Sequence, residues 1–244
     1  MRSRSHTTSA SSRSRRHGWS ARAAAVILTV ALAGPGVRAL AGQAAPAMPK
    51  AYPSRPTPLP EAEEIALARS AAPAEVSGHA AVWVLRASGP AKASEGTNGC
   101  TCMVSRDLHP GSLYPICYDQ EATRTVFPRD LMELKLRFEG RSEAQVKEAI
   151  ARADADGTLP PRTKPALVYM MSSRQMLFTS SEPDGRPVGA WHPHLMIQLP
   201  GATDQQFGFG AGGAPGDLQL DHPGEPGAQL IVPVTWWADS AKGS

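Results

Sequence analysis

The chain of 244 residues contains little of what characterises specialised protein classes. Its three cysteines are too few for a disulfide-dense scaffold, and no Gly-X-Y repeat supports a collagen triple helix. No apolar run of about 18 residues recurs along the chain, which excludes a polytopic membrane protein. Aromatic residues make up only 6% and charged residues 19%. The 22 glycines and 23 prolines instead indicate a loop-rich chain, long enough to bury a hydrophobic core.

The chain also lacks the short motifs that identify common active sites. It has no Gly-x-Ser-x-Gly nucleophile elbow, no His-Glu-x-x-His zinc motif and no Cys-x-x-Cys pair. The glycine-rich segment 208–216 lacks the lysine and the following helix of a phosphate-binding loop. The sequence therefore identifies no established catalytic class.

Positive charge is concentrated at the N-terminus. The formal net charge is +3, but residues 1–41 hold seven arginines and no acidic residue. Small and apolar residues fill 23–33, and Ala39-Leu40-Ala41 fits the small-x-small rule for cleavage. As a helix, this apolar run spans about 16 Å, roughly half of a bilayer core. We expect residues 1–41 to be a signal peptide, and the protein to be periplasmic or secreted, with no stable membrane span after cleavage.

Removing this segment changes the sign of the charge. Without the seven arginines, 18 basic residues face 22 acidic ones, a net charge of −4 over 203 residues. No basic stripe with interleaved aromatic residues is present, so we expect no nucleic-acid partner. The partner that remains is an unidentified small molecule or protein.

The rest of the chain predicts a spacer followed by one domain. Residues 42–60 contain six prolines and predict a flexible spacer, and residues 61–240 predict a single loop-rich α+β domain. We expect a mostly antiparallel sheet with two or three helices packed on it. The helices are predicted at 61–72, 130–139 and 142–153, the last because Ser142 and Gln145 form a capping box. The strands are predicted at 80–86, 100–105, 116–119, 166–171, 194–199 and 229–235, with 89–99 as a loop and 175–179 as a partner of 166–171.

The three cysteines allow more than one pairing. An exported protein meets an oxidising compartment, so one disulfide is expected. A disulfide between Cys102 and Cys117 would close a loop and stabilise the fold by roughly 3 kcal/mol. A Cys100–Cys117 disulfide closes a loop of similar length and is nearly as plausible. Cys100 and Cys102 would lie about 6.6 Å apart on a strand, near the upper limit for a disulfide. The cysteine left over is a buried thiol, a reactive thiol or a metal ligand, and no flanking motif supports the last two.

The segment Trp191-His192-Pro193-His194 is the most unusual stretch of the chain. On an extended backbone both histidines point to one side, which suits metal binding or acid–base chemistry; alternatively, their rings bond to the backbone. Asp119, Asp221 and His222 are the nearest further ligands by type, but none has a diagnostic spacing, so we expect neither a metal nor a cofactor. The candidate catalytic residues are His194, His192 and Asp119, and the candidate binding residues are Asn98 and Arg106.

Four short motifs form a set: Gly96-Thr97-Asn98-Gly99, Thr101-Cys102-Met103-Val104, Cys117-Tyr118-Asp119 and Pro193-His194-Leu195-Met196. Over residues 70–235, this set resembles a group of exported bacterial proteins of uncharacterised function. The position of Cys100 is more often a bulky apolar residue in that pattern. The resemblance therefore implies that Cys102 pairs with Cys117 and that Cys100 is the spare thiol. It implies no activity.

Three functions fit these observations. An exported domain that binds a small molecule or a partner is favoured, because no complete catalytic set is present. The alternative is a hydrolase-type enzyme centred on His192 and His194, with Asp119 or Arg106 assisting. A second alternative is thiol or metal handling through Cys100.

Overall fold

The computed structural model describes residues 56–109, 111–179, 185–210 and 217–240. The predicted signal peptide and residues 42–55 of the predicted spacer lie outside this part of the chain, as do 182–184 and 211–216 from the predicted turn and glycine-rich loop. Of the helices in the described part, none combines the length and the apolar character that a bilayer span needs.

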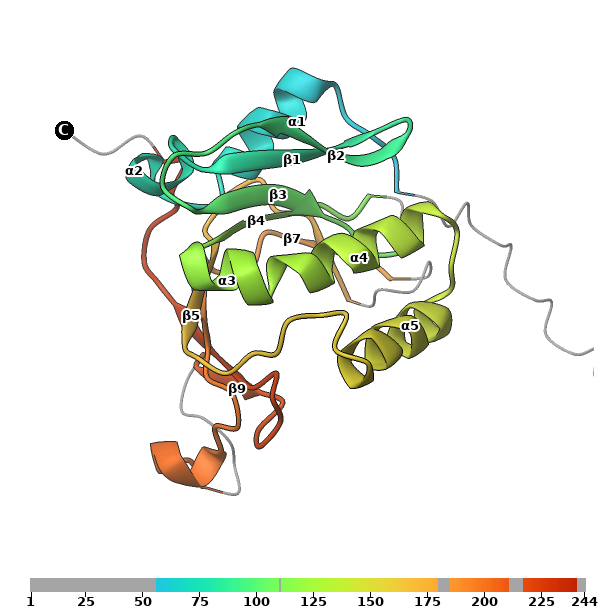
Figure 1. The fold of residues 1–244 in the computed structure, drawn as a ribbon. Helices are drawn as coiled ribbons and strands as arrows, with labels where there is room; N and C mark the ends of the chain where they lie inside the picture. Colours follow the sequence, from blue (N-terminus) through green and yellow to red (C-terminus); the bar gives the residue numbers. More distant parts are fainter. Residues whose placement is uncertain (1–55, 110, 180–184, 211–216, 241–244) are drawn as a thin grey trace, which may run out of the picture. The chain divides into compact units, whose positions relative to one another are not determined.

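A sheet of eight strands organises the described residues (Figure 1). Its order is β2-β1-β3-β4-β5-β8-β10-β9; β1 and β3 pair in parallel, and the other neighbouring strands are antiparallel. A separate sheet pairs β6 (Leu177–Phe178) with β7 (Pro187–Gly189). The strands of the large sheet are β1 (Ala81–Arg86), β2 (Gly89–Ser94), β3 (Thr101–Ser105), β4 (Tyr114–Tyr118), β5 (Ala166–Met170), β8 (His194–Gln198), β9 (Gln219–Asp221) and β10 (Gln229–Pro233).

Five α-helices and one 3-10 helix accompany the sheets in the described residues: α1 (Glu61–Arg69), α2 (Ala74–Ser77), α3 (Gln120–Thr125), α4 (Phe127–Phe138), α5 (Glu143–Ala155) and η1 (Asp204–Phe207). The predicted capping box begins α5, because the Gln145 N–H donates to the Ser142 hydroxyl at 3.3 Å and the Ser142 N–H donates to the Gln145 side chain at 3.0 Å. The predicted α+β class with a mostly antiparallel sheet is confirmed.

Helices cover both faces of the sheet. Successive strand residues point to opposite faces, and apolar side chains on each face pack against helices. Along β3, Cys102 and Val104 join a core cluster with α1, whereas Met103 joins a second cluster that contains α3 and α4 residues. Helix α5 packs on α4 through a third cluster built on Val146 and Ile150. Leu59, at the end of the predicted spacer, packs against the α1 cluster. The face that carries α3 and α4 is the one on which the candidate site is found.

Three local predictions are wrong. Residues 89–99 are not wholly a loop, because β2 forms a hairpin with β1. Strand β2 lies at the edge of the sheet, and Pro90 is tolerated there because an edge strand does not need every N–H for pairing. Residues 175–179 do not pair with β5, which lies between β4 and β8, and Leu177–Phe178 pair with β7 instead. Helix α3 has no counterpart in the prediction, although Asp119 is a typical residue for its N-cap.

Candidate functional site

The two candidate histidines contact one another but differ in exposure. His194 is buried in β8, and its Nδ1 donates to the His192 carbonyl oxygen at 2.7 Å. Burial lowers the pKa of His194, which keeps the ring neutral near pH 7. His192 is exposed, with its Nε2 3.8 Å from the Asp217 carboxylate. Among the described residues, no three His, Cys, Asp or Glu side chains are grouped to hold a metal ion.

Asp119 and Asn98 both hold backbone segments in place. The Asp119 carboxylate accepts from the Ala122 N–H at 2.7 Å, which caps α3, and from the Leu167 N–H at 2.9 Å, which ties the cap to β5. The Asn98 amide donates to the Val76 carbonyl at 2.8 Å, and its oxygen accepts from the Cys100 N–H at 3.0 Å. Each polar atom of these two side chains that could face a ligand thus has a backbone partner.

Arg106 forms a buried ion pair with Glu64. Its two terminal nitrogens donate to the two Glu64 oxygens at 3.0 and 2.8 Å, and the two side chains are only 3% and 1% exposed. The same carboxylate accepts from the Leu85 N–H at 2.8 Å. Arg106 also donates to the Val104 carbonyl at 2.9 Å, so neither partner presents a free group to solvent. The structure places Arg106 in the interior of the fold, and the sequence prediction that it binds a ligand has no support from these contacts.

The cysteines are arranged as the resemblance implies. Cys102 and Cys117 face each other across β3 and β4 and form a disulfide, with Cα atoms 4.0 Å apart. Cys100 is a free, half-buried thiol. Burial, and then the charge of Asp119, raises the pKa of Cys100. A raised pKa lowers the thiolate fraction, so this environment does not activate the thiol.

The predicted residues therefore do not assemble one site. His192 and His194 lie together near the start of β8, and Asn98, Cys100 and Asp119 lie near one another before β3 and after β4. Arg106 is buried beside Glu64.

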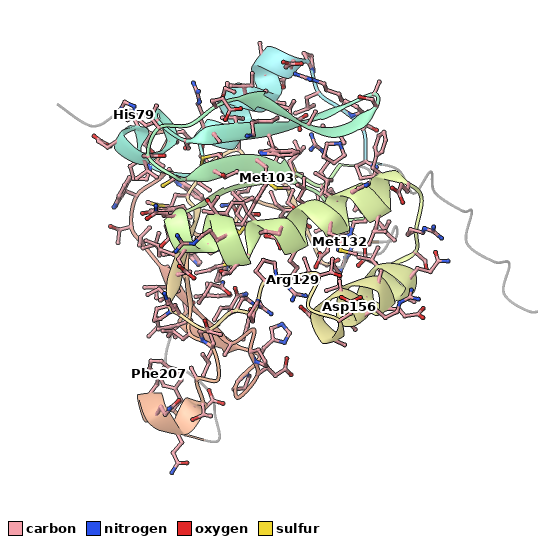
Figure 2. All side chains as sticks on the ribbon, viewed as in Figure 1. His79, Met103, Arg129, Met132, Asp156 and Phe207 are labelled. Atoms are coloured by element: carbon pink, nitrogen blue, oxygen red, sulfur yellow. A yellow bond between two sulfur atoms is a disulfide. The ribbon has the colours of Figure 1, made fainter. Side chains whose placement is uncertain are left out.

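A cavity of about 400 Å³ lies elsewhere, and none of these predicted residues lines it. We call it the α4 cavity, because α4 contributes Arg129, Asp130 and Glu133 to its wall. Its floor is an apolar strip of the sheet, formed by Ile116, Val168 and Met196, with Val126 beside it. In Figure 2, Arg129 projects from α4 toward the loops of the C-terminal part. The size is that of a small-molecule site.

Two loops and two strands complete the α4 cavity. Gln198 and Gln229 reach it from β8 and β10, and the Gln198 amide donates to the Gln229 oxygen at 2.7 Å. The loop before β10 contributes His222, which has a left-handed backbone with φ of 53°, an unusual conformation for a residue with a side chain. Arg162 comes from the loop before β5. It lies over Gly227, where an added Cβ would be 2.6 Å from the Arg162 Nη2. Gly227 therefore leaves the space that the guanidinium occupies.

Arg129 and Arg162 differ in whether a carboxylate forms an ion pair with them. Arg129 forms an ion pair with Asp154, but its buried Nε has no hydrogen-bond partner. Arg162 is half-buried and makes no hydrogen bond or ion pair with any described residue. Burial, and then the positive charge of Arg129, lowers the pKa of Arg162. An anion between these arginines would relieve that repulsion.

Asp130 is the second unusual group of the α4 cavity. One of its oxygens accepts from the Tyr118 hydroxyl at 2.6 Å, and Tyr118 is fully buried. Burial, and then the charge of Glu133, raises the pKa of Asp130 to about 7. Burial, and then the charge of Asp130, also raises the pKa of Tyr118 well above its ordinary value, so the phenol keeps its proton. The carboxyl group of Asp130 is therefore partly protonated at neutral pH.

The residues of the α4 cavity carry no common mark in the sequence. Arg129, Asp130 and Glu133 lie on the helix predicted there or next to it, but their side chains meet Arg162 and Gln198 only through the fold. Arg162 belongs to no motif, and His222 stood out only by residue type. Nothing in the sequence pairs these positions.

Comparisons of the chain with protein-family models, with curated proteins and with solved structures find no match. The resemblance to exported bacterial proteins thus stays a prediction, and the geometry of the described residues is what bears on function.

Proposed function

We propose that this protein is an exported domain that binds a small organic molecule in the α4 cavity. The observation that carries the proposal is a cavity of about 400 Å³ with an apolar floor, whose wall holds the buried Arg129 Nε without a hydrogen-bond partner and the half-buried Arg162 without a direct partner among the described residues. Buried donors are almost always hydrogen-bonded in folded proteins, so unpaired ones at a cavity indicate a ligand. A hydrolase centred on His194 is less favoured, because this ring is buried and bonded to the backbone.

Export is the second part of the proposal. It is supported by the signal-peptide pattern of residues 1–41 and by the Cys102–Cys117 disulfide, a bond typical of oxidising compartments. Expression of the full chain in a bacterium, followed by fractionation and N-terminal sequencing, tests this part. We expect a periplasmic or secreted product that begins at Gly42. A product that stays in the cytoplasm with its N-terminus intact would contradict export.

Binding is tested with four small probes of different chemistry: hexanoate, hexanamide, hexylamine and glucose. Saturation-transfer NMR reports which of them contact the protein. We expect at least one probe to bind the wild type and to lose binding in Met196→Trp, which places an indole in the α4 cavity. Leu195→Trp is the matched control, because the adjacent residue of β8 points to the other face of the sheet. If no probe binds, or if both variants bind equally, the α4 cavity is not the site.

A further inference from the structure

The charges around the α4 cavity are unequally matched. Glu133 lies 3.1 Å from the Arg137 guanidinium, and Glu225 lies 3.6 Å from the His222 ring. Arg129 is engaged by Asp154. Arg162 alone among the charged residues of this wall makes neither a hydrogen bond nor an ion pair in the described part of the chain, although the charges of nearby carboxylates act on it. The group without a direct hydrogen-bonded partner is thus a guanidinium, whose fork of N–H donors matches a carboxylate.

Asp130 provides a second hydrogen-bond donor for an anionic ligand. It is faced by Tyr118 from β4, by Arg129, Glu133 and Arg137 from its own helix, and by Arg162 from the loop. Because the Tyr118 hydroxyl donates to one Asp130 oxygen, the proton of the neutral carboxyl group resides on the other. That oxygen has no hydrogen-bond partner among the described residues, so a neutral Asp130 offers an O–H donor to a ligand.

The rest of the cavity limits the charge and shape of the ligand. The carboxylates of Glu133 and Glu225 line the same space, which disfavours a doubly charged anion such as phosphate. Ile116, Val168 and Met196 present an apolar surface, which suits a hydrocarbon group. A second cavity of about 540 Å³ shares Arg162 with the first and adds Leu159 and Pro160 to the apolar surface. Arg162 therefore borders both cavities.

We propose that the α4 cavity takes a monocarboxylic acid with a short apolar group, whose carboxylate is bound by Arg162 and by the carboxyl O–H of Asp130. The apolar group lies against Val168 and Met196. This inference rests on the proposed function and specifies its ligand class.

The test compares hexanoate with its uncharged and cationic counterparts by calorimetric titration of the disulfide-bonded protein at pH 6. We expect hexanoate to bind about tenfold more tightly than hexanamide or hexylamine, because only the acid forms charge-assisted bonds with the Arg162 guanidinium. Arg162→Gln should weaken hexanoate about tenfold or more. Arg152→Gln is the matched control, since Arg152 lies on α5 with 71% of its side chain exposed. Gly227→Ala should also weaken binding, because its methyl group displaces the guanidinium.

Asp130 is tested through pH. Binding that needs its neutral form should weaken about tenfold between pH 6 and pH 8 if the group titrates near pH 7. Asp130→Asn keeps an uncharged donor at every pH, so its affinity should change little over this range. A pH dependence that persists in Asp130→Asn would assign the effect to another group and would overturn the role of Asp130.

The two proposals fail in different ways. If hexanamide or hexylamine binds the wild type, loses binding in Met196→Trp, and hexanoate does not bind, the cavity is a binding site but the carboxylate class is wrong. Hexanoate affinity unchanged by Arg162→Gln would likewise overturn the assignment. If none of the probes binds, the proposed function itself fails.

Discussion

Two regions of the molecule treat buried polar groups in opposite ways. Beneath β1 and β3, Arg106 and Glu64 satisfy each other with two hydrogen bonds, and backbone groups satisfy the rest. Around the α4 cavity, Arg162 has no partner in the described residues, and the Arg129 Nε is buried without one. A saturated ion pair stabilises a fold and leaves nothing for a ligand. Hydrogen-bond donors without an acceptor lower the free energy of unfolding, and a bound ligand that accepts from them would offset that loss.

The largest effect is expected from breaking the saturated pair. Glu64→Gln leaves the Arg106 charge buried without a counter-ion, which should lower the free energy of unfolding by about 3–5 kcal/mol. Urea denaturation measures this loss. Glu64→Leu combined with Arg106→Met removes both charges, and its loss should be much smaller, because no uncompensated charge stays buried. Equal losses in the single and double variants would show that packing, not charge, dominates there.

A smaller loss is expected from opening the disulfide, which lies in the same region. Cys102→Ser with Cys117→Ser should cost about 2–4 kcal/mol, because the unfolded chain regains the freedom of the closed loop. Cys100→Ser is the matched control and should change stability by under about 1 kcal/mol, since the thiol is half-buried and unpaired. A large loss in the control, measured by the same denaturation, would mean that Cys100 has a structural role as well.

The third expected effect concerns the pH dependence of stability and tests the region of the α4 cavity. The pKa of Asp130 is about 7 in the folded protein and ordinary when unfolded, so the folded state holds this proton between about pH 4 and 7 while the unfolded state loses it. The contribution of Asp130 to stability therefore falls as pH rises through that window and is constant above it. Asp130→Asn should gain stability relative to wild type at pH 8 but not at pH 4. The difference between the two proteins isolates Asp130 from His194, whose lowered pKa acts in the opposite direction. An identical difference at both pH values would contradict a raised pKa.

Local sequence signals predicted those regular elements that depend on local chemistry. Ser142 and Gln145 mark the start of α5 through a capping box that needs no tertiary contact. The apolar run 166–171 corresponds to the buried strand β5. Strand β2 was missed because Gly89 and Pro90 disfavour a strand interior but are tolerated at an edge, and the sequence does not show which strand is the edge.

The candidate site was not predictable in the same way. Polar residues such as Arg106 and Asp119 attract attention in a sequence, but the fold uses them for an ion pair and for a helix cap. Arg162 and Asp130 have no local mark, and they meet only because α4 and the loop before β5 converge over the sheet. Arg162 is distinguished by the absence of a direct partner in the described structure, and Asp130 by its burial beside the Tyr118 hydroxyl. Residue type alone reveals neither.

The most direct test maps the position of a bound acid by NMR chemical shifts in the methyl-labelled protein titrated with hexanoate. The account predicts that the Met196 and Val168 methyl signals of the α4 cavity shift and saturate together. The Val82 and Val84 signals, from the region of the saturated ion pair, should stay in place. Shifts confined to Val82 and Val84, or no saturable shift at Met196, would contradict the claim that the unpaired groups of the α4 cavity form the binding site.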